Sequence, residues 1–379
     1  MKPEADGGVL GSLCSTVDDL GPDVVVLLRH GRTGASAAVV VDNTACGPAI
    51  GGTRMATDVT VEEVARLARA MTFKSATARL PHGGAKAGIV ADPSMPAREK
   101  EAVIRWFAQA IRDLHSFIPG PDIGTDERCM AWIHDEIGRS VGLPATLGGI
   151  PLDELGATGY GLAIAAQAAA AAGQIGLRGA RVAIQGFGAV GTHTARFLAE
   201  RGASIVAVSD SRGAIGDSTG LPVDELVAWK RAGGQVAEFA GGAPLDRDCV
   251  IGTDCEILVP AARPDVITGA NVHEVKATLV LEAANIPVTR DAEATLHGRG
   301  VLCLPDWVVN AGGVICASAE YAGEGRAGAF ERIAQTIREN TVMVIERSTH
   351  EATLPRVVAE ELALARVREA LSFRRSWSV

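Results

Sequence analysis

The chain has 379 residues, of which 47% are hydrophobic and 21% are charged, a composition typical of a globular protein with room for two domains. Its net charge of −9 argues against binding to nucleic acid and to an anionic membrane surface. The seven cysteines are odd in number and never spaced C-x-x-C, which favours reduced thiols in a cytoplasmic protein over disulfides or a zinc site.

No targeting or membrane segment is expected. The first residues, MKPEADGG, include acidic side chains and no apolar core, so they do not resemble a signal peptide. The most apolar long stretch, at 161–177, is rich in alanine and contains Gln167 and Gln174. It predicts a packed helix and not a membrane span.

The first part of the chain mixes predicted strands with helices. Apolar runs at 24–30 and 36–42 predict strands, and the segment 61–76 predicts a helix. Thr60 followed by Glu63 forms a capping-box pattern where this helix begins.

Two lysines stand where apolar side chains are expected. The apolar stripe of the predicted helix passes through Leu67 and Met71, and Lys74 continues it. Lys86 follows a pair of glycines in the otherwise apolar segment 79–90. Because an unpaired buried charge costs several kcal/mol, Lys86 either reaches solvent from a turn or faces a ligand.

A Gly/Pro-rich connection at 142–157 marks a predicted domain boundary. After it the pattern becomes an alternation of strands and helices, which is typical of a parallel sheet. The predicted strands are RVAIQ at 181–185, SIVAVSD at 204–210, EILVP at 256–260, ATLVLEA at 277–283 and VLCLP at 301–305.

A dinucleotide-binding fingerprint follows the first of these strands. Gly186, Gly188 and Gly191 give G-x-G-x-x-G between a strand and a helix, which is the context that the motif requires. The first glycine allows a tight turn, the second admits the pyrophosphate, and the third lets helix and strand touch. The helix N-terminus then faces the phosphates with free N–H groups. The residues assigned to the cofactor in this loop are Gly186, Phe187, Gly188, Ala189, Val190 and Gly191.

Asp210 follows Gly191 by 19 residues and ends the next predicted strand. A carboxylate there can accept hydrogen bonds from the adenosine ribose and repel a 2′-phosphate, so NAD is favoured over NADP. Arg212 weakens this preference, because an arginine can accommodate the phosphate. Ser211 lies between them in the same predicted site, and the alternative is that Asp210 only caps a turn.

A dinucleotide domain implies hydride transfer, so Lys74 and Lys86 become candidates for a charged substrate pocket. One ammonium can hold a carboxylate, and the other can act as a base near neutral pH. Asp122, in the turn-rich segment 119–127, is a plausible partner. This combination suits the oxidation of a carbon that bears an amine and a carboxylate.

The chain resembles the glutamate/leucine/phenylalanine/valine dehydrogenase superfamily over roughly residues 25–325. The matching stretches are GGTRM at 51–55, MTFKSA at 71–76, LPHGGAKAG at 80–88, PGPDIGTDERCMAWI at 119–133, ATGYG at 157–161, VAIQGFGAVG at 182–191, EAANIPVT at 282–289 and PDWVVNAGGV at 305–314. Their common order along the chain is more specific than any single motif.

The resemblance implies roles for individual residues. Lys74 would bind the substrate α-carboxylate, Lys86 would activate the attacking water, and Asp122 would carry protons to and from the amine. The other residues assigned by resemblance are Ile50, Gly51, Gly52, Met71, Ala317 and Asn310 for the substrate, and Thr158, Ala284, Asn285 and Asn310 for the cofactor. No metal site is expected.

The sequence departs from the glutamate-specific pattern at two positions. Ile50 stands where those members carry a lysine, and Ala317 stands where they carry a serine. The pair is similar to the members that act on branched-chain and aromatic substrates, and it predicts that apolar L-amino acids exceed glutamate in kcat/KM by roughly a hundredfold. His82 is read as a turn residue, with an influence on Lys86 as the alternative.

The resemblance implies an α/β fold of two domains with a cleft between them. Residues 1–148 would form an α/β substrate-binding and oligomerisation domain, and residues 149–325 a doubly wound, Rossmann-type domain. Residues 326–379 would form helices that pack back toward the first domain.

The predicted function is NAD-dependent oxidative deamination of an apolar L-amino acid to a 2-oxo acid and ammonia, and the reverse reaction, by a homo-oligomer. The alternatives are a glutamate dehydrogenase and a catalytically inactive nucleotide-sensing homologue. The presence of Lys74, Lys86 and Asp122 argues against the last, because a protein that only binds needs no buried base.

Overall fold

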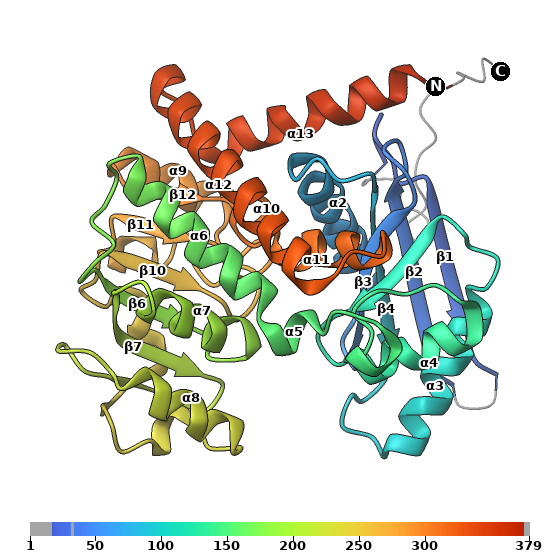
Figure 1. The fold of residues 1–379 in the computed structure, drawn as a ribbon, viewed down its shortest axis with the longest axis horizontal. Helices are drawn as coiled ribbons and strands as arrows, with labels where there is room; N and C mark the ends of the chain where they lie inside the picture. The colour runs from blue at the N-terminus through green and yellow to red at the C-terminus, as the bar shows by residue number, and fades with distance from the viewer. Residues whose placement is uncertain (1–16, 32–33, 375–379) are drawn as a thin grey trace. The chain divides into compact units, whose positions relative to one another are not determined.

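A computed structural model describes residues 17–31 and 34–374, which form two compact units (Figure 1). The first unit comprises the described residues of Met1–Pro151, Val314–Ala329 and Leu362–Val379. The second comprises Leu152–Gly313 and Phe330–Glu361. The predicted domains at 1–148, 149–325 and 326–379 stay a prediction, and the two units distribute the C-terminal residues differently from them.

The first unit contains a five-stranded mixed sheet in the order β1-β2-β4-β3-β5. Strand β2 pairs antiparallel with both β1 and β4, whereas β3 pairs parallel with both β4 and β5. The strands are β1 (Val24–Arg29), β2 (Ser36–Asn43), β3 (Ala49–Ala56), β4 (Gly84–Val90) and β5 (Phe117–Pro121). The helices are α2 (Val61–Thr77), α3 (Ala97–Ala110), α4 (Glu127–Ile137) and the short η1 (Ala145–Leu147).

Helices cover both faces of this sheet, and successive side chains of β2 point to opposite faces. Val39 and Val41 belong to the core that the sheet forms with α3 and α4. Val40, between them, packs instead with Val64 and Ala68 of α2. Because both faces are buried, β2 is continuously apolar from Ala37 to Val41 and does not alternate with polar residues there.

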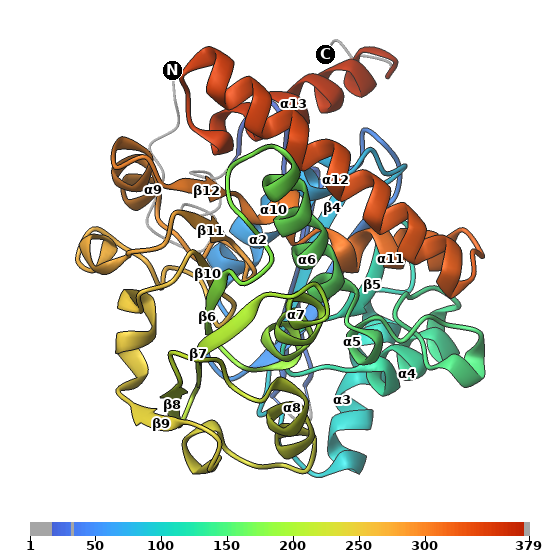
Figure 2. The same cartoon turned by 60° about the vertical axis from the view of Figure 1, so that its left-hand side comes forward.

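The second unit contains a seven-stranded sheet in the order β12-β11-β10-β6-β7-β8-β9 (Figure 2). The five strands from β12 to β7 are parallel, and β8 and β9 add an antiparallel edge. The strands are β6 (Arg181–Gln185), β7 (Ser204–Asp210), β8 (Gly213–Gly216), β9 (Ala243–Leu245), β10 (Ile257–Pro260), β11 (Leu279–Leu281) and β12 (Leu302–Leu304).

Six helices of the described residues lie wholly within this unit. They are α5 (Leu152–Leu155), α6 (Ala157–Ala171), α7 (Ala189–Ala199), α8 (Val223–Arg231), α9 (Arg290–Gly298) and α10 (Asp306–Val309), with the turns η2 (Val236–Glu238), η3 (Arg247–Gly252) and η4 (Val272–Glu274). Three further helices contribute residues to both units, namely α11 (Gly312–Tyr321), α12 (Arg326–Glu351) and α13 (Pro355–Ser372).

The predicted two-domain α/β fold with a parallel, Rossmann-type sheet is confirmed. All five strands predicted for the second domain form parallel strands, each within a few residues of its predicted bounds. The sequence analysis missed β8 and β9, because runs of three or four residues with glycine and proline carry too little periodicity to indicate a strand.

The predicted start of α2 is confirmed, but only half of its capping box forms. The Thr60 side chain accepts a hydrogen bond from the Glu63 backbone N–H at 3.2 Å. The Glu63 carboxylate contacts the guanidinium of Arg54 and so serves an ion pair instead.

Within residues 17–31 and 34–374, no helix is both long and apolar enough to cross a membrane. The six cysteines of this part, all except Cys14, are not joined in disulfides. Cys14, the MKPEADGG segment and the end of the basic C-terminal tail lie outside the described residues.

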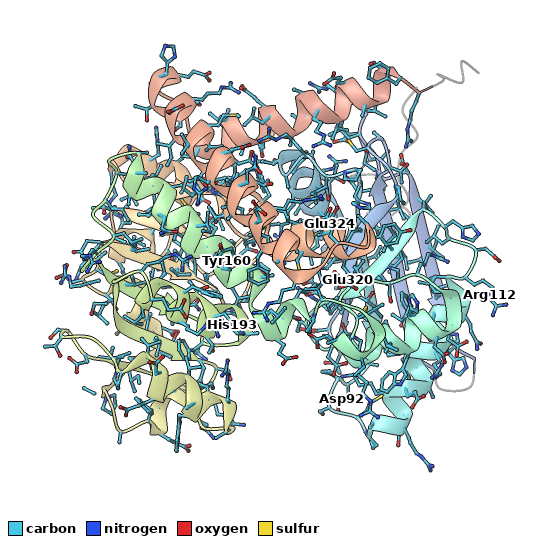
Figure 3. All side chains as sticks on the ribbon, in the orientation of Figure 1. Asp92, Arg112, Tyr160, His193, Glu320 and Glu324 are labelled. Atoms are coloured by element: carbon cyan, nitrogen blue, oxygen red, sulfur yellow. The ribbon has the colours of Figure 1, made fainter. Side chains whose placement is uncertain are left out.

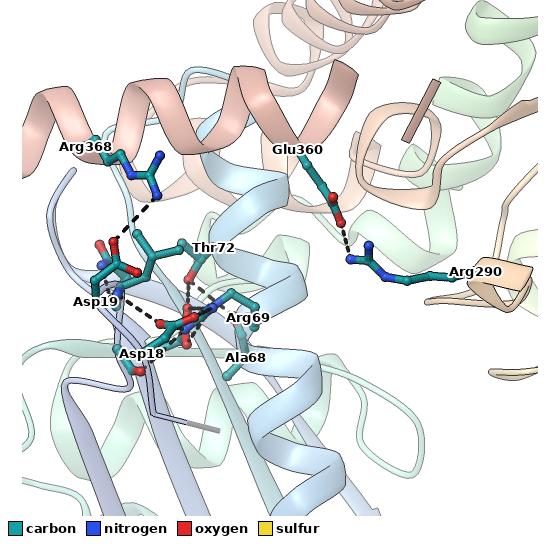
Figure 4. Close-up of polar contacts among 12 residues, drawn as sticks. Asp18, Asp19, Ala68, Arg69, Thr72, Arg290, Glu360 and Arg368 are labelled. Atoms are coloured by element: carbon teal, nitrogen blue, oxygen red, sulfur yellow. Dashed lines mark hydrogen bonds and ion pairs between the residues drawn. The ribbon is translucent and has the colours of Figure 1, made fainter. Parts of the chain in front are cut away.

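A charged cluster fastens the segment before β1 to α2 and β2 in the first unit (Figure 4). The Arg69 guanidinium on α2 contacts Asp18 at 2.7 Å and the buried Asp42 on β2 at 2.9 Å. Thr72, one turn further along α2, donates a hydrogen bond to Asp42 at 2.6 Å. Burial raises the pKa of Asp42 despite these partners, so its ionised form depends on Arg69.

Replacing Arg69 by methionine should lower the free energy of unfolding by about 3 kcal/mol, because it leaves the buried Asp42 without its cation. Urea denaturation followed by circular dichroism measures this loss. The matched control is Arg105→Met, which also removes an arginine paired with carboxylates, here Glu101, Asp135 and Glu136. These three side chains are 19–69% exposed, against 3% for Asp42, so the control should cost less than about 1 kcal/mol. Equal losses in the two variants would contradict the role given to Asp42.

Candidate active site

Lys86 lies inside strand β4 with only 5% of its side chain exposed. Its register partner on β2 is Val40, and directly opposed residues of neighbouring strands point to the same face. Lys86 therefore points to the face covered by α2, while Ala85 and Ala87 on either side belong to the core on the other face. The lysine does not reach solvent from a turn.

The Lys86 ammonium forms an ion pair with the carboxylate of Asp122. Asp122 directly follows β5, and 11% of its side chain is exposed. A turn fixes the carboxylate, since the Asp122 Oδ1 accepts the Ile123 N–H at 2.7 Å and the Thr125 hydroxyl contacts the Asp122 backbone N–H at 3.0 Å. The structure thus brings together two of the residues that the sequence assigns to catalysis.

A second cation lies against the same carboxylate. The Nε of Arg54, on β3, is 3.8 Å from Asp122 Oδ2, and only 8% of the Arg54 side chain is exposed. Burial alone would raise the pKa of Asp122, but the charges of Lys86 and Arg54 outweigh burial and hold that pKa below its ordinary value. Asp122 is consequently ionised at neutral pH and able to accept a proton.

Glycine is required where other chain segments approach this pair closely. A Cβ on Gly52 would lie 2.9 Å from the Cβ of Asp122, closer than real contacts allow. A Cβ on Gly84 would overlap the backbone of Thr72, so glycine lets α2 cross directly over β4. Gly52 therefore leaves room for Asp122 beside Lys86, and Gly84 leaves room for α2.

The other residues assigned to the substrate, Asn310 excepted, also fall in the first unit. Lys74 is buried near the end of α2, and Met71 is half-buried one turn before it. Ile50 and Gly51 are buried on β3, and Ala317 is buried on α11. Their roles as substrate contacts stay a prediction.

Ala317 belongs to a helix that the first unit holds firmly. Glu320 lies one turn further along α11 (Figure 3). Its carboxylate accepts the N–H groups of Leu143 at 3.1 Å and Ile150 at 2.8 Å. The pKa of Glu320 is raised by burial, although these backbone hydrogen bonds oppose the rise. Glu320 was not found by sequence analysis, because its partners are backbone groups far away in the chain.

His82 is a packed residue and not an exposed turn residue. Its side chain is buried, Nδ1 lies 3.0 Å from the carbonyl oxygen of Pro48, and its ring meets the edge of Tyr321 with centroids 5.7 Å apart. Burial lowers the pKa of His82, so the ring is neutral at pH 7.

In the second unit, the three fingerprint glycines have the geometry that a dinucleotide requires. Gly186 has a φ of 100°, as the tight turn after β6 demands. A Cβ on Gly188 would meet no atom within 4 Å, which leaves the space for a phosphate. A Cβ on Gly191 would overlap the carbonyl of Gly186, so only glycine allows α7 to pack this close to β6. The residues of the loop fit the group that the fingerprint implies.

The residues between these glycines differ in what they can offer a cofactor. Ala189 and Val190 form the first turn of α7, whose N–H groups are free to meet an anion. The Phe187 side chain is 1% exposed, so it packs inside the unit and only its backbone faces the loop.

Asp210 ends β7 as predicted, but its carboxylate already has protein partners. Oδ2 accepts from the Lys230 ammonium at 2.7 Å and from the Val236 N–H at 3.0 Å, and Oδ1 accepts from the Arg212 N–H at 2.9 Å. Burial would raise the pKa of Asp210, yet these hydrogen bonds hold it below its ordinary value. Ser211 and the side chain of Arg212 are exposed beside it.

Asn310 is buried at the end of α10 and clamps the segment that precedes Asn285. Its Nδ2 donates to the carbonyls of Ala283 and Ala284, both at 3.1 Å. Within the described residues its Oδ1 is buried and accepts no hydrogen bond, so a ligand amide could satisfy it. Thr158 lies in the first turn of α6. Its hydroxyl lies close to Gly313, where a Cβ would be only 3.1 Å from Oγ1.

One cluster in the described part of the chain has the composition of a metal site. Ligand atoms of Glu282, Glu293 and Cys303 lie within 4.8 Å of one another, and all three residues are buried. The guanidinium of Arg356 already contacts both carboxylates and supplies the positive charge there.

Three cations were not predicted as partners of carboxylates. They are Arg54 beside Asp122, Lys230 beside Asp210, and Arg356 beside Glu282 and Glu293. The position of Arg54 in GGTRM, next to the paired glycines, was a usable signal. Lys230 and Arg356 gave no such signal, since each lies on a helix at least 20 residues away in sequence from the carboxylate that it contacts.

Comparison with known proteins assigns the chain to a family. The family described as glutamate/leucine/phenylalanine/valine dehydrogenase matches residues 148–375, and its dimerisation domain matches residues 25–139. The glutamate dehydrogenase of Aeropyrum pernix is 39% identical over 88% of this chain and 85% of its own length. The NADP-specific glutamate dehydrogenase of Saccharolobus shibatae is 37% identical over 81% of this chain and 74% of its own.

A solved structure supports the same assignment. The hetero-hexameric glutamate dehydrogenase of Thermus thermophilus, in its leucine-bound form, superposes with a TM-score of 0.88 and 30% identity. The match covers 99% of this chain and 100% of that one. The chain belongs to the glutamate/leucine/phenylalanine/valine dehydrogenase family and is an NAD(P)-dependent amino-acid dehydrogenase acting on CH–NH2 groups.

Proposed function

We propose that this chain converts an L-amino acid to the 2-oxo acid and ammonia, and back, with Lys86 and Asp122 as its catalytic residues. The observation that carries the proposal is their buried ion pair beside Gly52, where the absence of a Cβ makes room for Asp122. A buried lysine in contact with a carboxylate places two acid–base groups at one point, where each can exchange a proton with a bound substrate.

The substrate is held by the first unit. The Lys74 ammonium binds the α-carboxylate, and a buried site strengthens this attraction. Asp122 accepts a proton from the substrate ammonium group, which leaves the neutral amine from which oxidation begins. When bound, NAD(P) accepts the hydride from the α-carbon.

Lys86 then acts on the oxidised substrate, an iminium ion. Once Asp122 has taken the substrate proton, it no longer offers the Lys86 ammonium a negative charge, and the ammonium releases its proton to solvent. The neutral lysine then takes a proton from water as the water attacks the α-carbon, which gives a carbinolamine. Asp122 delivers its proton to the amine, the C–N bond breaks to release ammonia, and the ionised Asp122 takes the hydroxyl proton, which leaves the 2-oxo acid. Arg54 keeps Asp122 charged between turnovers by adding a second positive charge.

Glutamate is the first candidate substrate, because the two relatives of highest identity described above are named glutamate dehydrogenases. The apolar L-amino acids predicted from the sequence are not confirmed by these relatives. They remain the second candidate on a specific observation, namely that Ile50 and Ala317 are 3% and 4% exposed and carry no charge for a side-chain carboxylate.

A panel of L-amino acids assayed with NAD and with NADP separates the candidates. Turnover of glutamate above leucine, valine and phenylalanine would support the first. An excess of the apolar substrates by roughly a hundredfold would support the second. Absence of turnover across the panel, with the cofactor still bound, would favour the inactive sensing homologue.

Ile50→Lys should raise the ratio of kcat/KM for glutamate over that for leucine by at least about tenfold, because it offers a cation to a buried carboxylate. The matched control is Ile50→Met, which keeps the apolar volume and should leave the ratio within about twofold. If Ile50→Lys folds and leaves the ratio unchanged, position 50 does not face the substrate side chain.

For the cofactor we propose NAD as the preferred form, with NADP also accepted. Asp210 stays ionised at the tip of β7, which disfavours a 2′-phosphate. Lys230 neutralises much of that charge, and Arg212 is exposed beside it, so the discrimination is modest. That a relative is named NADP-specific agrees with tolerance of NADP.

Lys230→Met should increase the preference for NAD over NADP in kcat/KM by about tenfold, because it leaves the Asp210 carboxylate uncompensated near the phosphate. Lys230→Arg, which retains the charge, is the control and should keep the wild-type ratio. A lower preference for NAD in Lys230→Met would mean that Lys230 is a direct contact of the NAD ribose.

We also propose that the chain assembles with copies of itself in the cytoplasm. The match of residues 25–139 to a dimerisation domain and the hexameric state of the Thermus thermophilus protein support assembly. Light scattering on the purified chain tests it, and a monomeric mass at micromolar concentration would contradict it.

A further inference from the structure

The segment between β11 and α9 holds a residue in a strained conformation. Ile286 has a φ of 50°, in the left-handed region that β-branched residues rarely adopt. Such a residue keeps this conformation only where its surroundings impose it, and such strain gathers at functional sites. Ile286 directly follows Ala284 and Asn285, the residues assigned to the cofactor.

Hydrogen bonds fix Ile286 on both sides of its strained backbone. Its N–H donates to Asp306 Oδ2 at 3.0 Å, and its carbonyl accepts the N–H of Asp265 at 2.9 Å. The preceding carbonyls, of Ala283 and Ala284, are held by Asn310. Asp306 and Asn310 begin and follow the same short helix, α10, so this helix sets the shape of the whole segment.

Asp306 in turn belongs to a buried cluster centred on Arg356 of α13. The Arg356 side chain is 7% exposed and lies 2.8 Å from Glu282, in direct contact with Glu293, and 3.7 Å from Asp306. These three carboxylates are 0–3% exposed. The guanidinium also lies over the ring of Trp307, 4.4 Å from its centroid.

The cluster gathers three carboxylates around one guanidinium, so its integrity depends on Arg356. Burial raises the pKa of Glu282 well above its ordinary value even with Arg356 in contact. Loss of the guanidinium would leave the carboxylates buried without their cation and force them to protonate or move. Asp306 would move the segment with it, because one of its oxygens faces Arg356 and the other holds Ile286.

We infer that Arg356 is a positioning residue for the dinucleotide. Through Asp306 it keeps residues 283–286 and the neighbouring Asn310 in the one arrangement that receives the nicotinamide end. The inference rests on the proposed contacts of Ala284, Asn285 and Asn310 with the cofactor. Arg356 lies on the C-terminal helix α13, outside all the motifs that resemble the family, and would nevertheless affect the affinity for the cofactor.

The test compares NADH binding by Arg356→Met with a matched control. Isothermal titration calorimetry should give a dissociation constant weaker by about tenfold in Arg356→Met, as expected when a strained segment loses its fixed shape. The KM for the cofactor should rise with it, while the KM for the amino acid stays unchanged. Arg347→Met is the control, since Arg347 also joins two carboxylates, Glu351 and Glu361, near the C-terminus but at an exposed site.

A second variant covers the case in which Arg356→Met does not fold. Asp306→Ala leaves Arg356 paired with Glu282 and Glu293 but removes the acceptor of the Ile286 N–H. It should weaken NADH by a similar factor, and where both single variants fold, the double variant should lose less than the product of the two factors because they act in one path.

Three outcomes separate this inference from the proposed function. If Asn310→Ala weakens NADH binding while folded Arg356→Met and Asp306→Ala bind NADH as the wild type does, Arg356 has a structural role only and the inference is overturned. If folded Arg356→Met and Asp306→Ala both weaken NADH binding and Arg347→Met does not, the inference holds, and a folded Arg356→Met that binds NADH normally overturns it whatever Asp306→Ala does. If the wild-type chain binds neither NADH nor NADPH, the proposed cofactor contacts fail and the inference falls with them.

Discussion

The position of Lys86 inside a strand depends on the carboxylate of Asp122. A buried ammonium without a partner would lose its proton or pull the strand toward water, so the ion pair is the condition for a lysine at this point of β4. Several features of the first unit follow from it. Glycine is required at position 52, where a Cβ would lie against Asp122, and Arg54 adds the charge that keeps Asp122 ionised. The alternation of β4 places the lysine on one face and alanines on the other.

The second unit also contains a buried group of charged side chains, which holds a different segment. There a guanidinium, that of Arg356, is buried among three carboxylates, and one of these carboxylates shapes the segment around Ile286. In both units a buried charge fixes a short irregular segment after a strand, where the regular hydrogen bonds of the sheet have ended. Parallel sheets place such segments at their carboxyl edge, which is where α/β proteins bind ligands.

Much of this arrangement could be predicted from the sequence, because it is encoded locally. The fingerprint glycines, the strand that ends at Asp210 and the start of α2 at Thr60 each depend on neighbours within a few residues. The anomaly at Lys86 was also visible, since a lysine among apolar residues breaks a local pattern.

The partners of these residues could not be predicted in the same way. Lys230 neutralises Asp210 and Arg356 holds Glu282, but both pairs join segments that only the tertiary fold brings together. The substrate is a further case, because the prediction of an apolar side chain rested on Ile50 and Ala317 alone, whereas the relatives are named for glutamate. Two uncharged side chains do not fix the charge of a whole pocket.

The proposed role of the Lys86–Asp122 pair is to perform the chemistry and not to serve the cofactor. Turnover and NADH affinity measured on one preparation of Lys86→Met test this role most directly, with a melting curve to establish that the variant is folded. Turnover should fall by at least about a hundredfold, the usual contribution of a general base, while the NADH dissociation constant stays within about twofold of the wild type. Retained turnover, or an NADH affinity that falls in step with turnover, would contradict the account.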